Sequence, residues 1–367
     1  MLLTIFTFLL ILSVLIMVHE LGHFISAKKL GIKVEEFGFG LPPRIIGIKK
    51  GETIYSINWL PIGGFVRLFG EDREEDETKN IKHKAKNKKI NKKAFYSRPI
   101  WQRSLVLTAG VTMNFLLAVF IISFLFTQGV MMATNRVHVE KILPDSPAAV
   151  VGLKEKDTIK KLQIKLPNEE INITSGEQLI NTTREHLGEE IILVIDRSGQ
   201  EYHFPIVPRK DYPKDEGPIG IMISNYELVK YPVWQAPVLG TKEAFVMSYR
   251  LAKGIGTTIW KMISFQSVSK DVAGPVGIAQ LTGQAIKFGQ YAVLELVGLL
   301  SLNLAIVNIL PFPALDGGRL LFVLIEGTTG RKIRAKWERL IHQVGMIVLL
   351  GLIVLVTIND LVRIFVK

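Results

Sequence analysis

Two histidines and a glutamate occur within five consecutive positions, as His19-Glu20-Leu21-Gly22-His23. On a helix, the two histidines lie one turn apart on the same face, where both imidazoles can bind one zinc ion. Glu20 is then placed to act as a general base, which is the arrangement of a metal-dependent hydrolase. The alternative interpretation is a chance HExxH match near the end of an ordinary membrane anchor.

The setting of this motif is unusual for a hydrolase. Residues 2–18 are almost wholly apolar, so the motif continues a helix that is long enough to span a membrane. Ionisable groups at membrane depth cost roughly a few kcal/mol or more, so three of them in five residues need a compensating partner such as a metal. The sequence therefore predicts a zinc site inside the bilayer.

A third protein ligand is expected, because catalytic zinc usually has three and leaves one position for water. The chain has no cysteine, so this ligand must be His, Asp or Glu. Asp316 is the best candidate, because Pro311 and Pro313 must break a deep helix just before it. Glu326 is a rival ligand without this helix-breaking context. The other histidines are predicted to be surface or packing residues: His83, His138, His186, His203 and His342.

The composition predicts a membrane protein with at least one water-exposed domain. Of the 367 residues, 48% are hydrophobic and 21% are charged. The formal net charge is +12, but the basic residues lie beside apolar segments, where membrane topology explains them and nucleic-acid binding is not expected. Four membrane spans are predicted, within 1–30, 104–130, 291–325 and 344–367. Lys28 and Lys29 place the end of the first span in the cytoplasm, so both termini are extracytoplasmic.

The segments between the spans have distinct patterns. Residues 31–70 contain short alternating runs separated by Gly and Pro, which predict short strands at 34–39, 53–58 and 65–69. This region either enters the bilayer and pairs with a substrate strand, or forms a small cytoplasmic hairpin domain. Residues 71–103 and 326–343 are predicted to be cytoplasmic loops, the first with an acidic cluster followed by a basic run. Residues 131–231 are polar and strand-rich, which predicts an extracytoplasmic soluble domain.

Residues 232–290 are predicted to form an amphipathic surface helix, over 237–265, followed by a linker. The helix is long enough to cross a membrane, but five charged residues interrupt it: Lys242, Glu243, Arg250, Lys253 and Lys261. Connectivity favours the surface position. With four spans, the first and third end on the same side and Asp316 lies level with His19 and His23. A fifth span would place Asp316 across a hydrocarbon core about 30 Å thick.

With these motifs in their order, the chain resembles the site-2 protease family of intramembrane zinc metalloproteases, in particular the bacterial branch of the regulator of sigma-E protease. The matching motifs are HExxH at 19–23, GxxxN from Gly110 to Asn114, and NxxPxPxLDG from Asn308 to Gly317. Residues 139–159 resemble a PDZ domain, and 274–279 resemble a family element that precedes the third span. Well-known proteobacterial members carry two PDZ domains, whereas the length here allows one.

The resemblance implies a polytopic α-helical membrane protein with four transmembrane helices, a membrane-associated β-hairpin region and an inserted PDZ-like α+β domain. It implies that Zn²⁺ is bound by His19, His23 and Asp316, and that Glu20 passes a proton from water to the leaving amine. Asn308 is implied to hold the substrate backbone near the metal. Asn114 and Gly110 are expected to bind substrate beside the site, or else to serve plain helix packing. The implied substrates are single-span proteins of the inner membrane, such as anti-sigma factors or remnant signal peptides, cut near the cytoplasmic side.

Two other classes of function fit parts of the sequence. One is a membrane-anchored PDZ scaffold with vestigial metal residues. The other is a membrane-surface zinc protease that acts on soluble peptides.

Overall fold

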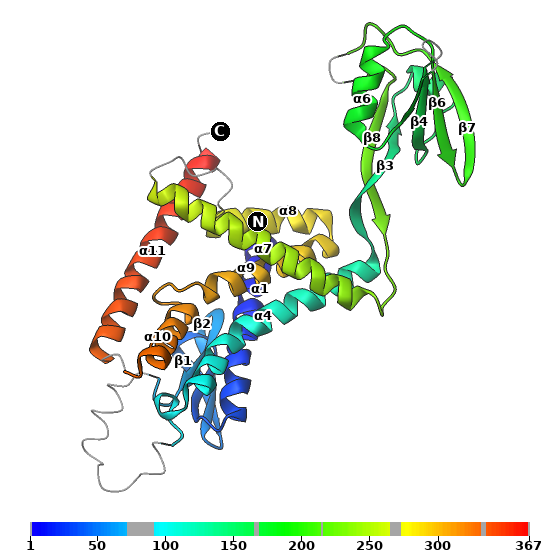
Figure 1. The fold of residues 1–367 in the computed structure, drawn as a ribbon. Coiled ribbons are helices and arrows are strands. Elements are labelled where there is room, and N and C mark those ends of the chain that lie inside the picture. The colour runs from blue at the N-terminus through cyan, green and yellow to red at the C-terminus, as the bar shows by residue number, and fades with distance from the viewer. Residues whose placement is uncertain are drawn as a thin grey trace, which may run out of the picture. The chain divides into compact units, whose positions relative to one another are not determined.

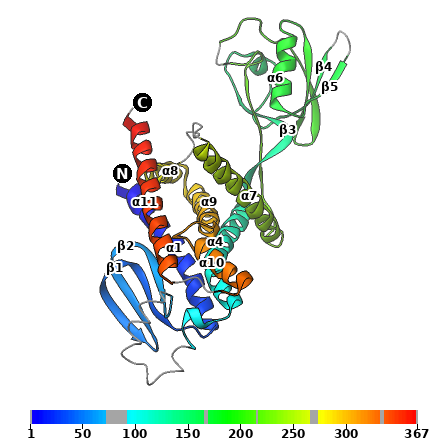
Figure 2. The same ribbon diagram turned by 60° about the vertical axis from the view of Figure 1, so that its left-hand side comes forward.

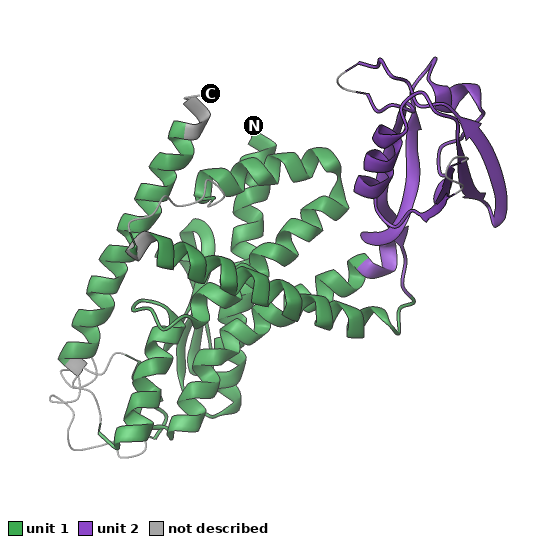
Figure 3. Ribbon diagram, turned by 45° about the horizontal axis from the view of Figure 1, so that its top comes forward, with its two compact units in different colours: residues 1–125, 232–367 green, residues 126–231 purple. Residues whose placement is uncertain are grey.

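The fold is given by a computed structural model, which describes residues 2–71, 92–164, 169–213, 216–264, 273–331 and 335–365. The chain divides into two compact units, residues 1–125 with 232–367 and residues 126–231 (Figure 3). Most of the charged loop predicted at 71–103, including the basic run up to residue 91, lies outside the described residues.

Long apolar helices form the frame of the first unit (Figure 1). Leucine, isoleucine, valine and phenylalanine follow one another with few charged residues, and such runs form helices that satisfy their own backbone in lipid. In the described part of the chain, four helices are long and apolar enough to cross a membrane. They are α1 (Leu2–Lys29), α4 (Ile100–Gln128), α9 (Gln290–Ile309) and α11 (Ala335–Phe365).

A bent two-stranded sheet lies against α1 and consists of β1 (Val34–Lys50) and β2 (Thr53–Leu68). Residues 36–39 of β1 are paired twice, with 64–67 on one side and with 54–57 on the other. The second half of β1 pairs with the first half of β2, down to Lys50 opposite Thr53. The short runs expected at 34–39, 53–58 and 65–69 are therefore parts of two longer strands, because each strand continues through its bend. Figure 2 shows the sheet beside the lower part of α1.

Three segments of the first unit differ from the predicted boundaries. The segment predicted at 291–325 contains two helices, α9 and α10 (Asp316–Thr329), because the helix breaks at residues 310–315, as Pro311 and Pro313 predict. The predicted loop 326–343 is mostly helical, because α10 continues to Thr329 and α11 begins at Ala335. Residues 232–290 contain two helices, α7 (Ala236–Ile263) and α8 (Pro275–Phe288), where one helix and a linker are expected. Gly274 and then Pro275 at the first helical turn are the signal for α8.

The N-terminus of α8 is held by the last helix. Gly274 offers no side-chain cap, and the carboxylate of buried Asp360 on α11 accepts a hydrogen bond from the Gly277 N–H at 2.8 Å. A carboxylate there satisfies one of the unpaired donors at a helix start.

The second unit is an α+β domain. Its sheet has the order β7-β6-β4-β3-β8, with β5 paired to β4. The strands are β3 (Val130–Ile142), β4 (Thr158–Ile164), β5 (Glu169–Asn172), β6 (Ile191–Arg197), β7 (Gln200–Ile206) and β8 (Ile221–Val229). Alternate residues of β4 and β6, such as Leu162 and Leu193, are buried with α5 (Pro147–Val150) and α6 (Gly176–Glu185) around one apolar core.

Candidate metal centre

The two motif histidines lie on one face of α1 and are both buried. His19 and His23 are 6% and 9% exposed, and their Nε2 atoms are 3.1 Å apart. The spacing of four residues brings both rings to the same side of the helix, as expected from its geometry. That face is turned toward α4.

Asp316 reaches the histidines from α10, where it is the first helical residue. Its Oδ2 lies 2.8 Å from Nε2 of His19 and 3.2 Å from Nε2 of His23. Gly317 and Gly318 follow directly, and side chains there would collide with the backbone carbonyls of residues 309–312. The tight turn into α10 therefore requires glycine at both positions. In the described part of the chain, these three residues form a group whose ligand atoms all lie within 4.8 Å of one another.

Helix α4 orients both imidazoles through contacts with their Nδ1 atoms. Nδ1 of His23 lies 2.8 Å from the backbone carbonyl of Val106, so Nδ1 carries the proton and Nε2 keeps its lone pair. The side-chain amide of Asn114, which is fully buried, lies 3.3 Å from Nδ1 of His19. Ser301 of α9 donates a hydrogen bond to the backbone carbonyl of Asn114 at 2.7 Å and fixes this part of α4.

Gly110 lies directly over the histidine pair. A Cβ at this position would be 2.5 Å from Nε2 of His23 and 2.7 Å from Nε2 of His19. Only a residue without a side chain leaves the space between the two imidazoles free. Gly22 of α1 lets α1 and α4 approach each other closely. A Cβ at this position would lie 2.7 Å from the carbonyl carbon of Ala109 on α4, so a larger residue would push the two helices apart.

Glu20 is half-buried and contacts the sheet. Its Oε2 accepts a hydrogen bond from the N–H of Val66 on β2 at 3.1 Å. Ser13, two turns earlier on α1, donates to the Pro61 carbonyl at 2.9 Å and accepts from the Gly63 N–H at 3.3 Å. The sheet is thus tied to α1 at Ser13 and at Glu20 itself, and the carboxylate stays beside the histidines.

The other residues singled out in the sequence lie in different surroundings. Asn308 is half-buried in the last turn of α9. Glu326, the rival ligand, is 8% exposed and forms a two-pronged ion pair with Arg103 of α4, with N–O distances of 2.8 and 3.0 Å. His138 contacts Thr158 in the second unit. His342 contacts the backbone next to Asp316, a contact that no pattern in the sequence indicates.

The comparisons with known proteins agree with this geometry. The sequence model of peptidase family M50 matches residues 7–352. The chain belongs to this family, the site-2 proteases. It is 33% identical to zinc metalloprotease RasP of Bacillus licheniformis, with 99% of each chain covered. It is 30% identical to the regulator of sigma-W protease RasP of Bacillus subtilis, again with 99% of each chain covered. RasP of Geobacillus kaustophilus is 30% identical, with 99% of this chain and 98% of that protein covered.

Membership of family M50 confirms three predictions from the sequence: the site-2 protease resemblance, the zinc metalloprotease activity and Zn²⁺ as the cofactor. The apolar helices agree with an integral membrane protein of this family.

The residues of the centre fit a zinc ion. Two imidazole nitrogens and a carboxylate oxygen are ligands that zinc prefers, and three protein ligands are typical of catalytic sites. The space kept free by Gly110 adjoins both Nε2 atoms. In addition, Oδ1 of Asn114 is buried and has no hydrogen-bond partner in the described structure. Turning the amide by 180° brings this oxygen to Nδ1 of His19, where it accepts the Nδ1 proton and leaves Nε2 available.

Proposed function

We propose that this M50 protein is an intramembrane protease that hydrolyses peptide bonds within the transmembrane segments of single-span membrane proteins. One observation supports this most directly. Two histidines in a membrane-length helix and an aspartate that follows another membrane-length helix place their ligand atoms within 4.8 Å of one another. A site assembled from such helices lies where a transmembrane substrate lies.

The roles of the residues follow from their contacts. His19, His23 and Asp316 would hold the zinc ion. Bound zinc acts as a Lewis acid that lowers the pKa of water and polarises a carbonyl. Glu20, held beside the histidines by the Val66 N–H, takes the proton from the attacking water and passes it to the leaving amine.

The convergence of these residues supports a topology with four spans. His19 lies near the C-terminal end of α1, and Asp316 follows the C-terminal end of α9. Their contact requires the two helices to end on the same side, as they do when α7 does not cross the membrane. Lys28 and Lys29 in the last turn of α1 favour the cytoplasmic side. The N- and C-termini are then extracytoplasmic, as is the second unit.

The sheet beside Glu20 has a free edge for an unwound substrate. Within the described residues, 64–68 of β2 pair with β1 on one side only, and the N–H of Val66 points to Glu20 on the other. A substrate strand added at this edge would satisfy its own backbone groups next to the metal. Asn308, nearby in the motif that ends α9, would hold the substrate backbone.

Exposed apolar side chains support a position of this sheet in the membrane. Ile46, Ile48, Ile57 and Trp59 are each more than half exposed. Apolar patches of this kind mark contacts with lipid or with other proteins.

Two features of the second unit support the proposal that it is a PDZ-like domain that binds a chain terminus instead of acting only as a size gate. β8 is an edge strand of its sheet, and a groove of about 760 Å³ lies between β8 and α6. Backbone atoms of β8 can pair with an added strand, and Arg184 of α6, which lines the groove together with Glu177, offers a positive charge. A substrate trimmed on its outer side has a new C-terminal carboxylate that suits this groove. The anti-sigma type of substrate is supported by the name of the Bacillus subtilis relative, a regulator of sigma-W protease.

The test measures zinc content and cleavage in purified wild-type protein and in Asp316→Ala. We expect about one zinc per chain in the wild type and cleavage of a model transmembrane substrate in preference to a soluble unfolded peptide. Both zinc and cleavage should be lost in Asp316→Ala and kept in Asp211→Ala, which replaces an exposed aspartate in the second unit. Zinc that survives Asp316→Ala would show that the third ligand is another residue. Preference for the soluble peptide would favour a surface protease.

A further inference from the structure

The loop that carries Asp316 has a strained backbone at Ala314. This residue has φ +77°, a conformation that residues with a side chain rarely adopt. Such strain persists only where the surroundings hold it in place. Only Leu315 separates Ala314 from Asp316, so the backbone position of Ala314 bears directly on that of Asp316. The tight turn at Gly317 and Gly318, which leaves no space for a side chain, holds the loop from the other side of Asp316.

The hydrogen bonds of this loop show what holds Ala314. Pro311 and Pro313 have no N–H. The N–H of Phe312 bonds to the Leu310 carbonyl at 2.7 Å, and the N–H of Leu315 bonds to the Phe312 carbonyl at 3.2 Å. The N–H of Ala314 instead donates to Nδ1 of His342 on α11 at 3.0 Å.

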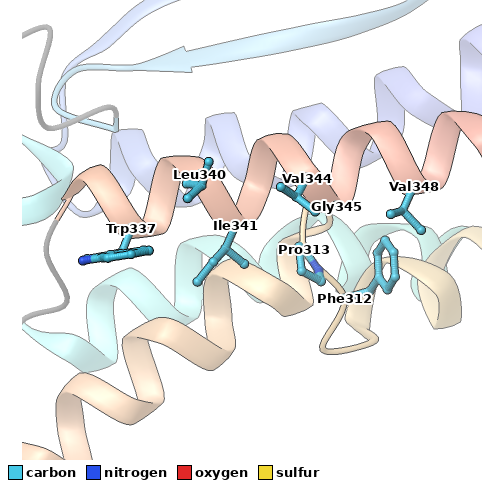
Figure 4. A pocket seen from close by; sticks show the side chains of 8 residues that line it. All are labelled: Phe312, Pro313, Trp337, Leu340, Ile341, Val344, Gly345 and Val348. Atoms are coloured by element: carbon cyan, nitrogen blue, oxygen red, sulfur yellow. The ribbon is translucent and has the colours of Figure 1, made fainter.

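The environment of this bond is apolar, and the partner ring is fixed. A groove of about 430 Å³ beside it is lined by Phe312, Pro313 and six residues of α11, none of them charged (Figure 4). A hydrogen bond is stronger where water is excluded, and an unmet backbone N–H is costly there. The His342 ring packs edge-on against Phe322 of α10, with ring centroids 5.4 Å apart.

A second residue of α11 supports the same loop. Gly345, one turn after His342, faces Pro313 in Figure 4. A Cβ at Gly345 would lie 2.8 Å from the Pro313 carbonyl oxygen, so the helix and the loop can meet only with glycine at this position. Helix α11 therefore has one residue that binds the loop and another that lets it approach.

We propose that His342 is a positioning residue for the metal centre: by accepting the Ala314 N–H, it fixes the loop that presents Asp316, and α11 thereby becomes part of the active-site structure. The inference rests on the proposed role of Asp316 as a zinc ligand. It assigns a function to a histidine that the sequence alone predicts to be a surface or packing residue.

The experiment compares three substitutions of His342 in the full-length protein. His342→Leu removes the acceptor. His342→Asn restores it, because Oδ1 of asparagine is the same number of bonds from the backbone as Nδ1 of histidine. His342→Gln places the acceptor one bond too far. Zinc affinity is measured by competition with a chelator, and kcat and KM are measured with a model transmembrane substrate at saturating zinc.

We expect zinc to bind about tenfold more weakly in the Leu and Gln variants. This is the lower end of the loss in metal affinity that follows when a residue supporting a metal ligand is removed. The Asn variant should bind zinc within about twofold of the wild type, because its acceptor is restored. In the Leu variant, kcat should fall and KM should stay nearly unchanged. A merely structural role of the ring would make Asn as damaging as Leu, and this result would overturn the proposal.

Two further variants keep the test decisive. Gly345→Ala should also weaken zinc binding, because its side chain pushes α11 away from the loop. If His342→Leu does not fold, unchanged zinc affinity in both His342→Gln and Gly345→Ala would overturn the proposal. Asp316→Ala separates the two hypotheses. If it keeps zinc, the proposed ligand set is wrong. If it loses zinc and the His342 and Gly345 variants do not, the ligand set stands and the inference about His342 is wrong.

Discussion

Substitution of Gly110 by alanine tests the arrangement of α1 and α4 most directly. The added Cβ would be 2.5 and 2.7 Å from the two Nε2 atoms, whereas nonbonded heavy atoms prefer about 3.5 Å or more. The rings would have to move by roughly 1 Å to relieve the contact. His23 cannot move freely, because its Nδ1 is bonded to the Val106 carbonyl. The methyl group therefore occupies the space beside both ligand atoms.

The expected loss is mainly in metal binding and not in folding. Overpacking a buried site costs about 1–3 kcal/mol. Alanine in a helix recovers about 0.5–1 kcal/mol relative to glycine, so the metal-free protein should remain folded. Zinc needs a nitrogen about 2.0–2.1 Å away, which the displaced rings cannot both provide. We expect zinc affinity to fall by about 100-fold or more, and cleavage with it.

The assay is zinc content and chelator competition, with thermal unfolding of the metal-free protein in detergent. Gly254→Ala in α7 is the matched control, because a Cβ there meets nothing within 4 Å, and it should bind zinc like the wild type. A Gly110→Ala protein with wild-type zinc affinity would refute the reasoning. It would mean that α4 does not lie over the histidine pair.

Three other substitutions test separate parts of the centre. Glu20→Gln should keep zinc and lose about 10²–10⁴-fold in kcat, and equal cleavage would remove Glu20 from the mechanism. Asn114→Asp should keep the wild-type zinc affinity, because its carboxylate can accept the hydrogen bond from Nδ1 of His19. Asn114→Leu should bind zinc about tenfold or more weakly. Equal zinc affinities of the two variants in chelator competition would show that the contact is unimportant. Arg103→Ala should destabilise the fold by roughly 3–5 kcal/mol, because it removes one partner of a buried ion pair with Glu326. Replacing both residues by leucine should restore most of the melting temperature. A small effect of the single substitution would contradict a buried pair.

Much of the centre could be predicted because its chemistry is local or limited by the membrane. The four-residue spacing of His19 and His23 decides that they share a helix face. The absence of cysteine limits the ligand types, and the prolines before Asp316 mark a broken helix at depth. These features led to the family and the zinc chemistry that the comparisons confirm. The roles of the individual site residues stay predictions.

The remaining features depend on residues far apart in the chain. The sequence could not show that Glu326 is paired with Arg103, because the two are 223 residues apart. It predicted short strands in 31–70 but not the double pairing of residues 36–39, which follows from a bend in β1 and β2. It placed Asn114 and Gly110 on one helix face but could not show that both adjoin the two histidines.

The sequence by itself determined which residues share a face and where helices must break, because both follow from short-range backbone geometry. Only the tertiary structure decided what each face meets: the Val106 carbonyl behind His23, the Glu20 carboxylate against β2, and His342 beneath the Asp316 loop. These contacts depend on how the helices pack against one another. Packing brings together residues that are far apart in the chain, by complementary shape and by the need to satisfy buried hydrogen-bonding groups, and no local sequence pattern encodes such pairs.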